Sequence, residues 1–161
     1  MPASVRDYVN RTVDMLLYDS PTEPFTQQAV QMLPGLVQPG QSGALTTGIQ
    51  KLAQRFILEL LTVRGSLRYL PDRGTSFLAE LRSGQLRTAS DVIDAFARAE
   101  HYIRGQLRRE QSETDPADER YRMAELLNAT HNGDRISLRV RVVSDAGEEA
   151  TIIYPLRINS V

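Results

Sequence analysis

Carboxylates are the side chains of this sequence that could do acid–base chemistry. A glycosidase needs two of them at a defined separation in a cleft, one as acid and the other as base or nucleophile. The candidates lie singly on the polar sides of expected helices or in segments of ambiguous pattern: Glu59, Glu80, Glu100 and Glu125. Glutamates in such positions are usually solvated, and we interpret all four in this way. We therefore expect no catalytic residue and no enzyme, and a relic glycosidase is the least favoured hypothesis.

Metal chemistry and nucleophilic chemistry have still fewer residues to use. The chain contains no cysteine, which excludes thiolate metal sites, disulfides and a cysteine nucleophile. Its two histidines, His101 and His131, have no partner at metal-ligand spacing. No Gly-x-Ser-x-Gly, P-loop or dinucleotide fingerprint is present. We expect neither a metal nor a cofactor.

Arginine supplies almost all of the positive charge, since Lys51 is the only lysine. Its planar fork suits bidentate contacts with carboxylates or phosphates. Nucleic-acid-binding modules usually add aromatic stacking residues and strongly clustered charge, whereas here the aromatic content is 6% and the net charge is −1. Solvated or protein-facing arginine is therefore favoured, and an arginine-rich nucleic-acid-binding adaptor is the alternative function. That alternative would use Arg64, Arg68, Arg73, Arg82, Arg87, Arg135, Arg139 and Arg141.

The length and composition fit one globular domain, because the chain has 161 residues of which 41% are hydrophobic. The start of the chain has no apolar stretch typical of a signal peptide, and no run approaches the roughly 20 apolar residues that span a bilayer. Proline and glycine between residues 34 and 43 indicate turns. We predict an N-terminal arm and loop over residues 1–44 and a single α+β domain over residues 45–161.

Two helices are predicted from apolar residues that recur at helical spacing. The first begins at Thr46 or Thr47, continues through the stripe that includes Leu52, Phe56 and Leu60, and ends at Gly65. A loop is expected over residues 62–86. The second helix begins within residues 88–91, which offer good N-caps, and its stripe runs from Val92 to Leu107.

The C-terminal third predicts antiparallel strands, because apolar and polar residues alternate over residues 135–142 and again over 150–158. Asp115-Pro116 resembles a helix start, but Asn132-Gly133 is a strong hairpin signal and needs a strand on each side. We therefore assign residues 121–130 to a third strand. Pro155 cannot donate to a ladder and indicates an edge strand. The predicted class is α+β, with two main helices packed on a small C-terminal antiparallel β-meander and an extended N-terminal arm.

The loop after the first helix reads Leu-Thr-Val-Arg-Gly-Ser-Leu-Arg-Tyr-Leu-Pro-Asp-Arg-Gly-Thr-Ser-Phe over residues 61–77. Gly65 and Gly74 permit backbone angles closed to other residues, and Pro71 stiffens the stretch between them. The sequence therefore predicts a rigid, shaped loop. A connection as long as residues 62–86 is, in compact domains, usually functional or disordered.

This loop, with the helix before it and the strands after it, resembles the baseplate wedge family of contractile phage tails. That family is also called the sheath initiator and was once described as lysozyme-like. Its signature is a helix ending in Leu-Thr, a glycine, an aromatic or aliphatic residue, and Pro-x-x-Gly-Thr, which match Leu61, Thr62, Gly65, Tyr69, Pro71, Gly74 and Thr75. The family's Glu-Pro-Arg triplet corresponds to Asp118-Glu119-Arg120, in which only the arginine is kept. The resemblance covers roughly residues 45–158.

The resemblance implies a structural subunit of the virion's tail baseplate, assembled in the bacterial host cytoplasm. Its partners would be the tail sheath protein, baseplate wedge proteins and tail tube or tube-hub proteins, with no membrane and no direct nucleic acid. It would join the wedge to the tail and template the first sheath ring by β-strand addition, a mode in which an edge strand accepts a strand from another chain. The expected interface residues are Tyr69, Pro71, Gly74, Thr75, Arg120, Arg139, Arg141, Ile153, Tyr154, Pro155 and Arg157.

Overall fold

Three helices and a three-stranded antiparallel sheet make up most of the described chain, which confirms the predicted α+β class. The computed structural model describes residues 11–12, 14–15, 45–132 and 135–157. Most of the predicted N-terminal arm lies outside these residues. The elements, in chain order, are β1 (Asp14–Met15), β2 (Leu45–Thr46), α1 (Gly48–Leu61), α2 (Phe77–Arg82), α3 (Ala89–Glu110), β3 (Tyr121–Asn132), β4 (Arg135–Ser144) and β5 (Glu149–Arg157).

The sheet has the order β3-β4-β5 and is the predicted meander. β3 pairs with β4 from Tyr121 opposite Ser144 to Asn132 opposite Arg135. Residues 121–130 therefore form a strand, as predicted. Residues 115–118 form a turn rather than a helix start. β5 pairs with β4 and stands at the end of the strand order, as predicted for an edge strand.

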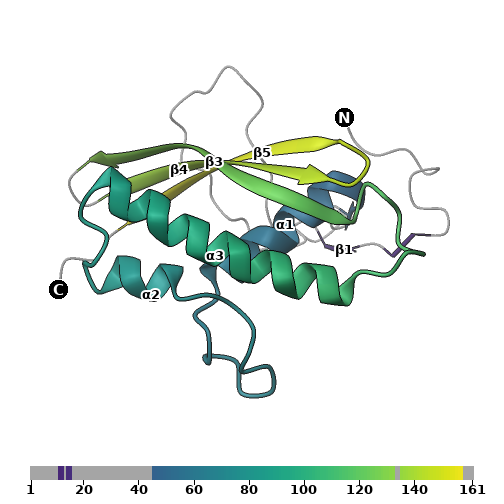
Figure 1. The fold of residues 1–161 in the computed structure, drawn as a ribbon, viewed down its shortest axis with the longest axis horizontal. Helices are drawn as coiled ribbons and strands as arrows, with labels where there is room; N and C mark the ends of the chain where they lie inside the picture. The colour runs from purple at the N-terminus through teal and green to yellow at the C-terminus, as the bar shows by residue number, and fades with distance from the viewer. Residues whose placement is uncertain (1–10, 13, 16–44, 133–134, 158–161) are drawn as a thin grey trace, which may run out of the picture.

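One face of the sheet carries the core. The alternate residues Ile136, Leu138, Val140 and Val142 of β4 are at most 1% exposed. They pack in one cluster with apolar residues of the three helices. Figure 1 shows α3 running along the sheet, and the alternation along β4 therefore directs the intervening residues to the opposite face.

α1 begins where predicted, but a distant carboxylate caps it. Thr47 is the N-cap residue and its side chain makes no capping hydrogen bond. The amide of Gly48 instead donates to Glu119 Oε1 at 3.1 Å, and Lys51 Nζ lies 2.7 Å from Glu119 Oε2. α1 ends at Leu61 rather than at Gly65, because the chain turns extended at the C-cap residue and enters the next loop.

α3 begins as predicted, with Thr88 as its N-cap. Thr88 and Asp91 form a capping box, in which each side chain accepts a hydrogen bond from the other's backbone amide. These bonds hold the pKa of Asp91 below its ordinary value, since they favour the charged carboxylate. No helix within the described ranges combines the length and the apolar character needed to cross a bilayer.

α2 is an element that the sequence did not predict. It lies within residues 62–86, which were expected to be a loop throughout, and it spans six residues. Its residues Phe77 and Leu81 are buried in the core. A helix this short presents too few turns for a periodic pattern, so packing rather than local propensity accounts for it.

A buried hydrogen bond joins α3 to the sheet and corrects one expectation. Glu100 was interpreted as a solvated acid, yet only 7% of it is exposed. Its Oε1 accepts from Tyr121 Oη at 2.7 Å and from Arg104 Nε at 3.0 Å. The Tyr121 ring also stacks on Phe56, with centroids 5.8 Å apart. Burial, together with the bond to Glu100, raises the pKa of the Tyr121 phenol well above its ordinary value.

We expect Tyr121→Phe to lower the free energy of unfolding at neutral pH by about 1–3 kcal/mol, because Glu100 loses a buried donor. The raised pKa also predicts an alkaline effect. The stabilisation is complete below the unfolded pKa of about 10 and is lost as pH rises above it, at about 1.4 kcal/mol per pH unit, because only the unfolded state releases the proton there. Urea unfolding at several alkaline pH values measures this slope. It should be smaller in Tyr121→Phe, and an equal slope in both proteins would contradict the assignment.

Candidate functional site

The connection between α1 and α2, residues 62–76, is closed at its base by backbone hydrogen bonds. We refer to it as the α1–α2 loop. The amide of Thr75 donates to the Thr62 carbonyl at 2.8 Å, and the amide of Arg64 donates to the Thr75 carbonyl at 3.0 Å. Further along, the Gly65 amide donates to the Pro71 carbonyl at 3.0 Å. Figure 1 shows this loop extending away from the rest of the described chain.

Gly74 and Thr75 belong to this base and not to an exposed surface. Gly74 has φ +85°, and a Cβ there would lie 2.2 Å from the Thr62 carbonyl oxygen. Thr75 is 3% exposed, and its hydroxyl donates to the Leu60 carbonyl at 3.1 Å. The chain itself encloses the Thr75 side chain, so this residue would act at an interface only by shaping the loop. Gly74 shapes the loop.

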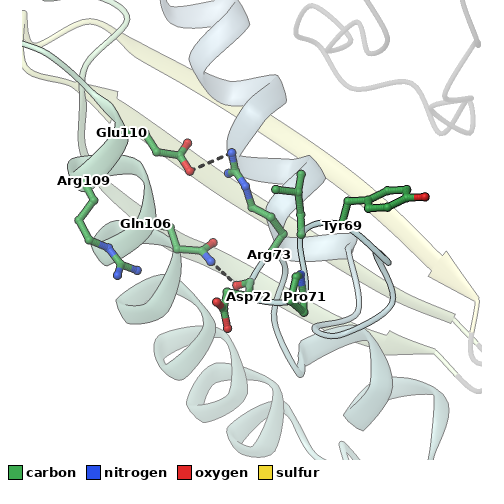
Figure 2. Close-up of a pocket in the computed structure, with 8 residues that line it drawn as sticks. Tyr69, Pro71, Asp72, Arg73, Gln106, Arg109 and Glu110 are labelled. Carbon is green, nitrogen blue, oxygen red and sulfur yellow. Dashed lines mark hydrogen bonds and ion pairs between the residues drawn. The ribbon is translucent and has the colours of Figure 1, made fainter.

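Charged side chains tie the loop to α1 and α3. Glu59, in the last turn of α1, accepts from the Gly74 amide at 2.9 Å and from the Arg73 guanidinium. Arg73 also lies 2.8 Å from Glu110 of α3, as Figure 2 shows, and Arg55 lies 3.2 Å from the same carboxylate. The side chain of Glu59 is 12% exposed, so its interpretation as a solvated acid is wrong.

Two further residues of α3 hold the loop by its backbone. Tyr102 Oη donates to the Asp72 carbonyl at 2.7 Å, and the side-chain amide of Gln106 donates to the same oxygen. The Arg64 guanidinium lies 4.5 Å from the centre of the Tyr102 ring. The loop is thus bound from both helices, and these contacts add to the stiffness predicted from its glycines and proline.

The far part of the loop exposes apolar side chains. Leu67 is 43% exposed, Tyr69 84% and Leu70 54%. We call these three residues the loop tip. Arg68 lies among them, its guanidinium 5.5 Å from the centre of the Tyr69 ring. Clustered apolar exposure typically marks an interaction site. Because the loop is already held in place, little conformational entropy remains to be lost on binding.

A cavity of about 300 Å³ lies between the loop and the last turns of α3. Figure 2 shows the loop on one side and α3 on the other. Pro71, expected at the interface, lies in its wall. The lining residues are Tyr69, Leu70, Pro71, Asp72, Arg73, Gln106, Arg109 and Glu110.

Arg120 lies far from this loop. Its neighbour Glu119 contacts the first residue of α1, whereas the loop follows the last, and 14 helical residues rise about 20 Å. Asp118 pairs with Arg11 at 2.6 Å. Arg120 Nε lies 3.6 Å from Asp145 in the turn between β4 and β5. Asp118 and Glu119 therefore hold residue 11 and the start of α1.

Arg139 and Arg141 occupy a third surface, the sheet face opposite the core. Arg141 is paired with Glu125 on β3 and lies 3.7 Å from Glu149 on β5. The loop residues Tyr69 and Pro71, the single residue Arg120, and the pair Arg139 and Arg141 therefore lie in three separate places.

The predicted interface residues on β5 include side chains that are buried. Tyr154 is 5% exposed and Ile153 is 9% exposed, so the predicted contact at these residues would use their backbone rather than their side chains. Tyr154 lies on the core side of the sheet and belongs to the core cluster. Pro155 and Arg157 have their backbone in β5, and their side chains lie outside the described residues.

The sequence missed several residues of the site. Leu67 and Leu70 had a detectable signal, because they are large apolar residues between two glycines of a loop. No sequence signal marked Gln106, Arg109 and Glu110, because polar residues at the end of a predicted helix are ordinarily solvated.

Acid–base and metal chemistry gain no support from the site. Glu59 and Glu110 share Arg73 as an ion-pair partner. Asp72, the other carboxylate that lines the cavity beside Glu110, lies 3.7 Å from Arg64. In the part of the chain that the structure describes, no group of three or more His, Asp or Glu residues is placed to hold a metal ion. Comparison of the chain with protein-family models, curated proteins and solved structures found no match.

We expect Glu59→Gln to loosen the loop, because a neutral amide is a weaker acceptor for the Gly74 amide and for Arg73. Hydrogen exchange of the Gly74 and Thr75 amides should become at least about tenfold faster, with little change in the core strands. Glu113→Gln is the matched control, since Glu113 is exposed in the turn after α3. Unchanged exchange at Gly74 in Glu59→Gln would show that the carboxylate does not hold the loop.

Proposed function

We propose that this chain is a structural subunit of a contractile phage tail baseplate. It joins the wedge to the tail through the α1–α2 loop, and it templates the first ring of sheath protein through the edge of β5. The resemblance of residues 45–158 to the sheath initiator family is the reason for proposing this particular assembly. The observation that carries the proposal is the exposed apolar tip of a loop that two helices hold in place.

The loop has the properties of a preformed docking element. Leu67, Tyr69 and Leu70 place three large apolar residues within four positions, all more than 40% exposed. The bonds from Glu59 and Gln106 reach the backbone at Gly74 and Asp72, so they hold the loop and leave the tip side chains uncovered. A rigid element with an apolar tip loses little entropy on binding, whereas a catalytic loop needs converging polar groups.

β5 supports strand addition by its place and by its proline. Among the residues that the structure describes, it stands at the end of the strand order and pairs with β4. Pro155 stays in register opposite Ser137 although it has no amide hydrogen, so its nitrogen faces away from β4. Because backbone groups alternate along a strand, the amide of Arg157 points the same way. A partner strand would bind there through main-chain hydrogen bonds.

One observation favours the alternative, an arginine-rich nucleic-acid-binding adaptor. Tyr69 is exposed beside Arg68, and an exposed ring next to a cation can stack on a base. Against it, Arg73 and Arg141 are paired with carboxylates, and Arg64 lies 3.7 Å from Asp72. That alternative requires DNA binding that falls steeply as salt increases.

The double substitution Tyr69→Ser with Leu70→Ser should weaken binding to the neighbouring wedge protein by about 2 kcal/mol or more, because it removes the apolar anchors. The melting temperature should hardly change, since both side chains are exposed. Native mass spectrometry after co-expression with wedge and sheath proteins measures the complex. Ile93→Ser is the matched control, as Ile93 is 52% exposed on α3, away from the loop. Full assembly of the double variant would contradict docking by the loop tip.

Replacing Arg157 with proline should slow sheath nucleation, because it removes a donor at the outer edge of β5. Arg157→Ala is the matched control, since it removes the same side chain and keeps the amide. Light scattering from purified sheath protein seeded with each variant gives the nucleation rate, and circular dichroism verifies that the sheet is intact. Equal rates for folded proline and alanine variants would rule out strand addition at this position.

A further inference from the structure

The cavity between the α1–α2 loop and α3 contains an unsatisfied buried acceptor. Gln106 is 5% exposed, and its nitrogen donates to the Asp72 carbonyl. Its Oε1 is buried and has no hydrogen-bond partner within the described residues. A buried polar atom in this state lowers stability until a donor reaches it. Figure 2 shows the Gln106 amide beside Asp72, between the two walls.

The walls of the cavity differ in chemistry. Tyr69, Leu70 and Pro71 supply an apolar wall on the loop side. Arg109 lies one helical turn after Gln106 on α3, and its Nε donates to the Gly105 carbonyl at 3.0 Å. The guanidinium carries further N–H groups beyond Nε. A ligand in the cavity would therefore meet an apolar surface and a cationic donor, and it would meet the Gln106 acceptor once that side-chain amide rotates.

The charges around the cavity favour a neutral ligand. Two guanidiniums, Arg73 and Arg109, line it together with two carboxylates, Asp72 and Glu110. Their formal charges cancel, so neither a free cation nor a free anion gains from the whole set. The volume of about 300 Å³ is at the lower limit of small-molecule sites and suits a single side chain better than a nucleotide.

We propose that the cavity receives a tyrosine side chain of the partner protein that the α1–α2 loop docks. This inference rests on the proposed docking function and names the anchor that the partner brings. The phenol ring packs against Leu70 and Pro71. The hydroxyl donates to Gln106 Oε1 and accepts from the Arg109 guanidinium. The bond to Oε1 requires the terminal amide of Gln106 to rotate about a torsion that has broad wells, which turns Oε1 toward the ligand and moves the nitrogen away from the Asp72 carbonyl. That carbonyl keeps its hydrogen bond from Tyr102 Oη.

Tyrosine fits this set of groups better than the other neutral side chains. Phenylalanine fills the apolar wall but leaves Gln106 Oε1 unsatisfied. Tryptophan offers a donor and no acceptor for Arg109. Serine and threonine have the hydroxyl but little apolar surface to bury. A phenol combines ring, donor and acceptor, which is why tyrosine is common among interface anchors.

The test uses the full-length protein and two small probes, N-acetyl-tyrosinamide and N-acetyl-phenylalaninamide, followed by NMR. The tyrosine probe should bind with a Kd of about 1 mM and shift the side-chain amide signal of Gln106. The phenylalanine probe should bind about tenfold more weakly, because the acceptor stays unsatisfied. Arg109→Met should weaken the tyrosine probe severalfold. Arg108→Met is the matched control and should not, since Arg108 does not line the cavity.

Three outcomes would overturn the inference: equal affinity for the two probes, shifts confined to residues outside the cavity, or no saturation by the tyrosine probe in the millimolar range, about 1–10 mM. Binding of a single-stranded oligonucleotide at the cavity in preference to the tyrosine probe would also overturn it and would favour the nucleic-acid alternative. The probes require no assembly partner. If neither probe binds, docking by the loop tip is not contradicted. If the tyrosine probe binds but the protein does not co-assemble with wedge and sheath proteins, only the proposed function is contradicted.

Discussion

Glu59 connects the end of α1 to the loop that follows it, and the geometry of the site depends on that contact. Its carboxylate accepts from the Gly74 amide and from Arg73, which in turn pairs with Glu110 on α3. The Gly74 amide and Arg73 stabilise the negative charge of Glu59, which would otherwise be unfavourable because its side chain is only 12% exposed. The network thus fixes the loop against two helices and determines where the tip and the cavity lie.

The same arrangement recurs elsewhere in the chain: a partly buried carboxylate joins segments distant in sequence. Glu119 binds the Gly48 amide 71 residues away and pairs with Lys51. Glu100 accepts the Tyr121 hydroxyl 21 residues away. These contacts explain how one small core holds α1, α3 and the sheet in a defined relation.

Regular periodicity made the main elements predictable. Apolar alternation around Ile136–Val142 and the turn signals beside it predicted the meander, and the stripe through Phe56 predicted α1. The glycines and proline of the loop predicted its rigidity. By contrast, α2 is too short to show a period. The burial of Glu59 and Glu100 could not be predicted from the sequence, because their partners, a backbone amide and a tyrosine, come close only when the chain folds. Gln106 became part of the site for the same reason.

The contact between Lys51 and Glu119 has a practical consequence for mapping any assembly that contains this chain. Lys51 carries the only side-chain amine in the sequence, and that side chain is 12% exposed and ion-paired. A protonated, paired amine is a poor nucleophile toward the amine-reactive cross-linkers commonly used for neighbour mapping. Such reagents would under-report the contacts of this protein in any complex that contains it. Reagents that couple carboxylates would report these contacts better. Asp72, for example, has a side chain that is 86% exposed, and it lines the cavity between the α1–α2 loop and α3.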